Sequence, residues 1–166
     1  MKYLPILILC FIFLCSSSEN NQVPKVLFAE PEISANVYDA EGNIIGKITN
    51  SVNNDKFLTL SLYKISDNRA FVSARYIFDD TFQISGYIDV KYLGIRTINK
   101  DTLFLYEEPN IDSKYRDTII NSDWSDIYKV ISLSGKWLYI ESYDGTTVNG
   151  WLSPEDQDAY PVTPAC

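Results

Sequence analysis

The sequence predicts an all-β protein in which two small β-barrels follow one another, after a cleaved signal peptide and a short tether. Composition favours strands, because 12 tyrosines and 8 phenylalanines accompany many β-branched residues, and such side chains pack well on a pleated sheet. Turn signals such as Asp144-Gly145 recur about every ten residues. Residues 35–93 also resemble residues 103–156 in pattern, which indicates an internal repeat.

The first element is an export signal at residues 1–15. Lys2 supplies a positive charge, residues 4–14 form an unbroken apolar run, and a polar segment begins at Ser16. An apolar run of this length is too short for a stable membrane-spanning helix, which needs about 20 residues. We therefore expect a signal that is cleaved, followed by a polar tether over residues 16–28.

The end of the apolar run resembles a bacterial lipoprotein signal, in which Cys15 would be the lipidated residue. This resemblance implies an exported protein held at a membrane of the cell envelope through its N-terminal lipid. Leu14 departs from the pattern, because that position usually holds a small residue. The alternative is ordinary secretion, with small residues Ser16 and Ser18 preceding a cut at Glu19.

Cysteine positions limit how the folded part is stabilised. Cys10 and Cys15 lie in the signal, and Cys166 is the last residue, so no disulfide can form within the folded part. The domain must be stabilised by packing alone.

The first unit of the repeat is expected over residues 29–96. Its predicted strands include residues 57–62 and 70–76, separated by polar turns. Near the end of this unit, "GYIDVKYL" at residues 86–93 has the pattern of a closing strand.

The second unit is expected over residues 97–157, with a flexible tail over residues 158–166 that contains two prolines. Residues 114–121 and 153–157 are expected to form at most single helical turns. Aligning the two units places Tyr38 on Tyr106, Phe71 on Trp137, and Gly86-Tyr87-Ile88 on Gly150-Trp151-Leu152.

The strand at residues 137–141 shows how one of these elements is expected to face. Alternation directs Leu138 and Ile140 to the core, and Trp137, Tyr139 and Glu141 to the opposite face. Asp144-Gly145 then predicts a hairpin turn, because glycine tolerates the positive φ that such turns need.

The second unit resembles the bacterial SH3-like domain. The resemblance rests on the order and spacing of "LFLYEEPNIDSKYRDTI", "DIYKVISLSGKWLYIE" and the closing "GWLS", over residues 101–156. The first unit is similar but lacks the proline and both tryptophans. The resemblance implies a small five-stranded barrel for each unit. It also implies non-catalytic binding in the cell envelope, with cell-wall peptide or an envelope protein as ligand.

Six residues of the second unit are predicted to bind that ligand. Aromatic side chains would grip it, and two carboxylates would bind ammonium groups of a wall peptide; the aromatic candidates are Tyr106, Trp124, Tyr143 and Trp151, and the acidic candidates are Glu107 and Asp126. For Trp151 two interpretations stay open, a groove residue or a ring that caps the core. Trp124 has polar neighbours, which favours a ligand platform, although a loop tryptophan can also fold back over a small barrel.

Several classes of function are excluded or disfavoured. The chain has no histidine, which excludes Ser-His-Asp and Cys-His catalysis and the usual zinc sets. No enzyme activity, cofactor or metal is expected. The net charge of −8, with scattered cations, disfavours nucleic acid as a partner.

Two alternative functions remain. One is a structural or assembly subunit of an envelope complex with no small ligand. The other is a glycan hydrolase that uses paired carboxylates, which must lie about 5–10 Å apart across a cleft. The acidic residues lie in polar turns, where a solvated surface role is the simpler interpretation.

Overall fold

The computed structural model describes residues 23–123, 125–143 and 148–160, and within these ranges all regular structure is β-strand or short 3-10 helix. The predicted all-β class is confirmed. The strands are β1 (Lys25–Phe28), β2 (Glu32–Tyr38), β3 (Ile44–Ser51), β4 (Leu58–Ser66), β5 (Arg69–Tyr76), β6 (Asp79–Asp89), β7 (Leu93–Thr97), β8 (Lys100–Tyr106), β9 (Tyr115–Ser122), β10 (Ile127–Ser134), β11 (Trp137–Glu141), β12 (Asn149–Leu152) and β13 (Gln157–Asp158). The 3-10 helices are η1 (Val52–Asn54), η2 (Val90–Tyr92) and η3 (Pro154–Asp156).

The strands form one antiparallel sheet that is not closed. Its order is β3-β2-β6-β5-β4-β1-β7-β10-β11-β12-β8-β9, and β13 pairs with β7 beside this path. The path ends at β3 and β9, so the pairing does not join either half into the ring expected of a barrel. No helix in the described part of the chain is long and apolar enough to cross a membrane.

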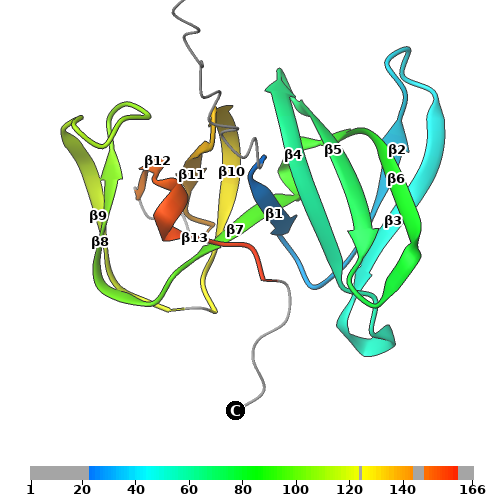
Figure 1. Ribbon diagram of the computed structural model, residues 1–166, viewed down its shortest axis with the longest axis horizontal. Helices are drawn as coiled ribbons and strands as arrows, with labels where there is room; N and C mark the ends of the chain where they lie inside the picture. Colours follow the sequence, from blue (N-terminus) through cyan, green and yellow to red (C-terminus); the bar gives the residue numbers. More distant parts are fainter. Residues whose placement is uncertain (1–22, 124, 144–147, 161–166) are drawn as a thin grey trace, which may run out of the picture.

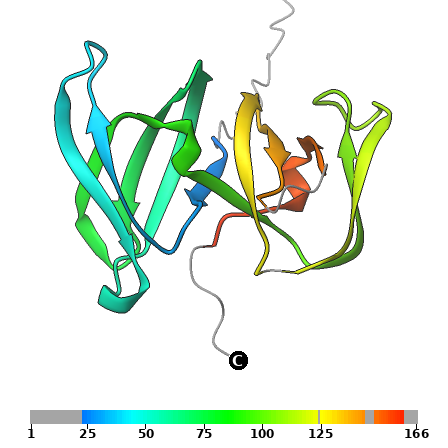
Figure 2. The same cartoon turned by 180° about the vertical axis from the view of Figure 1, so that it is seen from behind.

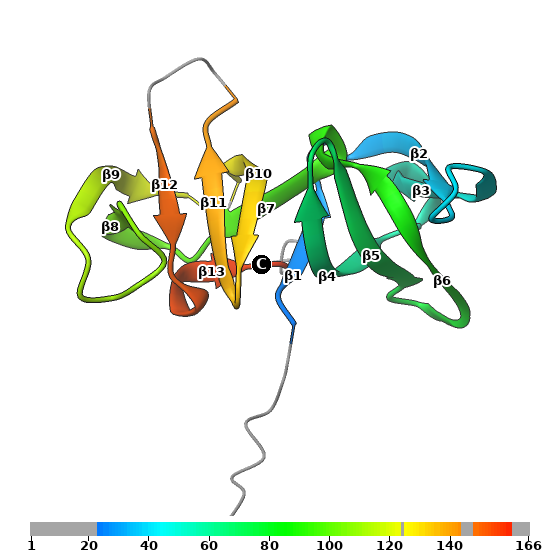
Figure 3. The same ribbon diagram turned by 90° about the horizontal axis from the view of Figure 1, so that it is seen from above.

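The two halves of the sheet lie on either side of β1 and β7 (Figure 1). Each half contains a hairpin, then a three-stranded meander, then a 3-10 turn that leads into a further strand. In the first half these are β2–β3, β4–β5–β6 and η2, and in the second they are β8–β9, β10–β11–β12 and η3. Figure 3 shows the two meanders side by side, with their strands running up and down the view.

Strand pairing supports most of the alignment between the halves. Tyr38 pairs with Tyr87, and Tyr106 pairs with Trp151, so these two pairs occupy equivalent positions. The expected match of Phe71 with Trp137 is wrong, because Phe71 pairs with Tyr87 whereas Tyr139 pairs with Trp151. A shift of two residues keeps every side chain on its face, so alternation alone does not reveal the error.

Strand β7 is shared by the two halves. One edge of β7 pairs with β1 through Leu27 and Gly94 and then with β13 through Gln157 and Thr97, and β7 also pairs with β10. Figure 2 shows β7 running from one half into the other. The boundary expected between residues 96 and 97 therefore falls inside a strand that both halves need.

The expected tether also differs from the structure. Its last four residues form β1, in which Val26, Leu27 and Phe28 are buried. These side chains leave water because β1 lies between β4 and β7. Likewise, the tail expected from residue 158 begins later, since Asp158 is still paired in β13.

One core runs through both halves. It includes Leu60 and Ile88 of the first half, Leu138 and Ile140 of the second, and Ile95 of the shared strand β7. The facing predicted for residues 137–141 is confirmed, because Leu138 and Ile140 are fully buried while Trp137, Tyr139 and Glu141 are only partly covered.

Candidate functional site

The structure brings together two pairs of the predicted ligand residues, in two different places. Asp126 and Tyr143 line one pocket, and Tyr106 pairs with Trp151 on the outer face of the sheet. Glu107 is exposed in the β8–β9 loop, where its backbone N–H donates to the Lys114 carbonyl at 2.9 Å. Trp124, Cys15 and the other cysteines lie outside the described residues.

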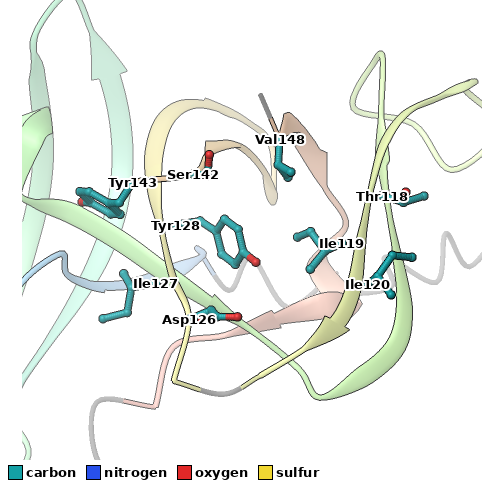
Figure 4. Close-up of a pocket in the computed structure, with 9 residues that line it drawn as sticks. All are labelled: Thr118, Ile119, Ile120, Asp126, Ile127, Tyr128, Ser142, Tyr143 and Val148. Atoms are coloured by element: carbon teal, nitrogen blue, oxygen red, sulfur yellow. The ribbon is translucent and has the colours of Figure 1, made fainter. Parts of the chain in front are cut away.

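The pocket lies between β9 and β10, which do not pair with each other in the open sheet. It has a volume of about 380 Å³, and we call it the seam pocket; it is lined by Thr118, Ile119, Ile120, Asp126, Ile127, Tyr128, Ser142, Tyr143 and Val148. Figure 4 shows Tyr128 in the middle of this group, with the β9 side chains on one side and Tyr143 on the other.

The inner wall of the seam pocket is apolar because alternation along β9 and β10 directs apolar side chains toward the inside. Ile119 of β9 and Tyr128 of β10 point inward and are only 6% and 8% exposed, whereas the neighbouring Ile120 is 63% exposed. The pocket thus combines a buried aliphatic and aromatic wall with an exposed apolar rim.

The negative group at the seam pocket is Asp126. Its backbone N–H donates to the Asp123 carbonyl at 3.0 Å, which fixes the turn before β10. Across the described ranges, its side-chain carboxylate makes no hydrogen bond or ion pair. Two carboxylate oxygens are therefore available to a donor that enters the pocket, beside the hydroxyl-bearing residues Thr118 and Ser142.

Tyr143 forms the opposite side of the pocket. Partial burial of Tyr143, which is 40% exposed, raises its pKa from 10.0 to about 12, with a smaller contribution from the Glu30 carboxylate. The Lys129 ammonium lies 4.9 Å from the centroid of its ring, in a cation–π contact that holds the ring in place. The phenol is thus fully protonated at neutral pH and can donate a hydrogen bond.

Replacing Tyr143 with phenylalanine should make stability less sensitive to alkali. Between pH 10 and about pH 12 the folded protein retains the Tyr143 proton that the unfolded chain loses, so wild-type stability falls as pH rises through this window. The variant lacks this contribution. Urea midpoints at both ends of the window should therefore differ less in Tyr143→Phe than in wild type. Tyr160→Phe, which removes the phenol of a more exposed tyrosine (61% exposed against 40% for Tyr143), is the control, and equal losses in all three proteins would contradict the prediction.

The second pair of predicted residues belongs to an aromatic layer on the face opposite the core. Tyr106 is only 6% exposed, because the rings of Trp137 and Tyr115 both contact it with centroids 5.3 Å away. Burial is also the main cause of its raised pKa. Trp151 is partly buried and packs edge-on against Tyr139, with centroids 5.4 Å apart. Tyr106 thus supports the layer from below instead of offering its ring to a ligand.

Sequence reasoning missed seven of the nine residues that line the seam pocket, namely Thr118, Ile119, Ile120, Ile127, Tyr128, Ser142 and Val148. Only Tyr128 carried a signal, since the alternation of its strand marks it as inward-facing. The others meet because β9 and β10, although consecutive in the chain, lie on either side of the pocket without pairing with each other. Comparison with protein-family models finds no match for this chain, and comparison with curated proteins finds no relative.

Proposed function

We propose that this protein is a non-catalytic binding protein of the bacterial cell envelope, which recognises an ammonium-bearing cell-wall peptide in the seam pocket. The observation that carries the proposal is the Asp126 carboxylate, which has no protein partner among the described residues and lies beside an aromatic and apolar wall. A carboxylate next to aromatic rings suits a cation with an aliphatic stem.

The size of the seam pocket suits a short peptide side chain. Ligand pockets in proteins have volumes of about 300–1,000 Å³, and this one, at about 380 Å³, lies at the small end of that range. The aliphatic stem of the ligand would lie against Ile119 and Tyr128, and its ammonium group would reach Asp126. Tyr143 would donate a hydrogen bond from its protonated phenol to an amide carbonyl of the peptide.

The location in the envelope rests on the sequence of residues 1–22. The positive start, the apolar run and Cys15 support an exported chain that is anchored through an N-terminal lipid, with secretion into the same compartment as the alternative. The proposal also includes two SH3-like units in tandem. The order of hairpin, meander and 3-10 turn in each half, together with the shared Tyr38 and Tyr106 pairings, supports it.

The test is a titration of isotope-labelled mature protein with soluble cell-wall fragments, followed through backbone amide shifts. We expect saturable shifts around Asp126 and Tyr143, and binding at least about tenfold weaker in Asp126→Asn, because a charged hydrogen bond contributes about 1.5–3 kcal/mol. Acetylating the amines of the fragments should have the same effect. Asp112→Asn, an equal charge change at an exposed position in the β8–β9 loop, should bind as wild type.

A flat response would favour the second candidate, a subunit that binds an envelope protein. The observation that supports it is the outer aromatic layer, where Tyr115 is 58% exposed and stacks on Phe104 with ring centroids 4.3 Å apart. Cross-linking in native envelopes would then yield one fixed partner, and Tyr115→Ser should remove that partner while Asp126→Asn leaves it in place.

A further inference from the structure

The first half contains a second pocket, of a different character. It has a volume of about 370 Å³ and lies between the β2–β3 loop and the β4–β5 turn; we call it the Arg69 pocket, and it is lined by Ala40, Ser66, Asp67, Asn68, Arg69 and Tyr87. Its lining is mainly polar, and its one cation is Arg69.

The guanidinium of Arg69 is held in place by the loop that it faces. Its Cζ lies 5.3 Å from the centroid of the Tyr38 ring. On another side it meets Gly42, where an added Cβ would be 3.7 Å from both terminal nitrogens. The loop itself is fixed by Asp39, which accepts hydrogen bonds from the backbone N–H and side-chain amide of Asn43 at 2.8 and 2.9 Å. The cation is therefore positioned before any ligand arrives.

No carboxylate of the described residues forms an ion pair with Arg69, although Asp67 also lines the pocket. Asp89 lies directly opposite it in the β5–β6 ladder, but the Asp89 carboxylate instead accepts the Lys91 backbone N–H at 3.0 Å and pairs with the Lys91 ammonium at 3.4 Å. Asp39 is occupied by Asn43. Arg69 is an exposed arginine whose guanidinium lies against an aromatic ring, with no ion pair or hydrogen bond among the described residues, so its N–H donors are available to an incoming anion.

We propose that the Arg69 pocket binds the free carboxylate of a peptide or small organic acid. The planar fork of a guanidinium matches a carboxylate, which it binds through two parallel hydrogen bonds. The side chains of Ser66, Asn68 and Tyr87 add polar groups around the same space. Asp67, also in the lining, opposes a second negative charge and so favours a monoanion over a phosphate dianion. The site is independent of the seam pocket and of the function proposed for it.

The test uses the full mature chain and acetyl-alanyl-alanine, a dipeptide with one free carboxylate. We expect saturable amide shifts at Arg69, Gly42 and Tyr87, with a dissociation constant on the order of millimolar for one charged fork. The C-terminal amide of the same dipeptide should give no saturable shifts. Acetate should reproduce the shifts if a carboxylate alone suffices, whereas dependence on the dipeptide would identify a peptide end as the source.

Matched variants separate this site from general charge effects. Arg69→Gln should weaken binding at least about tenfold, because both hydrogen bonds of the fork are lost. Arg75→Gln, which removes the same charge from an exposed position on the same strand, should bind as wild type. Three results would overturn the proposal: equal shifts from the acid and the amide, equal loss in both variants, or tighter binding of inorganic phosphate than of the dipeptide. Absence of any saturable shift would also overturn it.

Discussion

Replacing Ile95 with alanine is expected to destabilise both halves of the protein in a single unfolding transition. Ile95 is fully buried in β7, the strand that pairs with β1 of the first half and with β10 of the second. Truncating a buried isoleucine to alanine costs about 2–5 kcal/mol, through lost burial and the cavity that remains. Because the core is continuous through β7, we expect neither half to remain folded once this strand is lost.

The measurement follows each half with its own probe during urea unfolding. All three tryptophans lie in the second half, so their fluorescence reports on that half alone, while methyl signals of Ile48 and Ile88 report on the first. The two midpoints should coincide in wild type and move together in Ile95→Ala. The control is Ile48→Ala, an equally buried site on the end strand β3, in which the methyl signal of Ile88 alone reports on the first half. Separate midpoints for the two probes in wild type would show that the halves fold independently.

The sequence predicts best those features that depend on short-range pattern. Alternation was sufficient to predict that Leu138 and Ile140 are buried. The single helical turn expected within residues 153–157 corresponds to η3. Residues 114–121 were expected to form at most a helical turn but belong largely to β9, because pairing with β8 compensates for a weak local pattern. β1 was missed for a similar reason: four residues between polar segments show a strand only when their two partners are known.

The candidate site was predictable in kind but not in place. Residue type alone singled out Asp126 and Tyr143, and the structure places both at one pocket. Residue type could not indicate that Tyr106 is covered by Trp137, since that contact joins strands β8 and β11. The seam pocket itself depends on β9 and β10 coming close without pairing, which no spacing in the sequence encodes. Periodicity in the sequence predicts which face of a strand is buried, but not how two unpaired strands are placed relative to each other.

Replacing Gly150 with alanine is expected to destabilise the protein by at least about 2 kcal/mol. An added Cβ would lie 2.8 Å from the Leu105 Cβ and 3.2 Å from the Tyr106 carbonyl oxygen, at the point where β8 has a bulge. Gly150 also has φ = +154°, which side-chain-bearing residues rarely adopt. Strain in the backbone and overpacking each cost about 1–3 kcal/mol.

The same close approach recurs in the first half, which supplies a second test and a control. A Cβ on Gly86 would lie 2.7 Å from the Tyr38 carbonyl oxygen, beside the equivalent bulge, so Gly86→Ala should cost about 1–3 kcal/mol through overpacking. At Gly46 the added Cβ meets only the flexible tip of Ile84, so Gly46→Ala should be nearly neutral. The urea midpoint should therefore be highest for Gly46→Ala, lower for Gly86→Ala and lowest for Gly150→Ala. If Gly150→Ala were as stable as Gly46→Ala, the backbone of β12 would have to move away from β8, and the contact would not be the reason for glycine at this position.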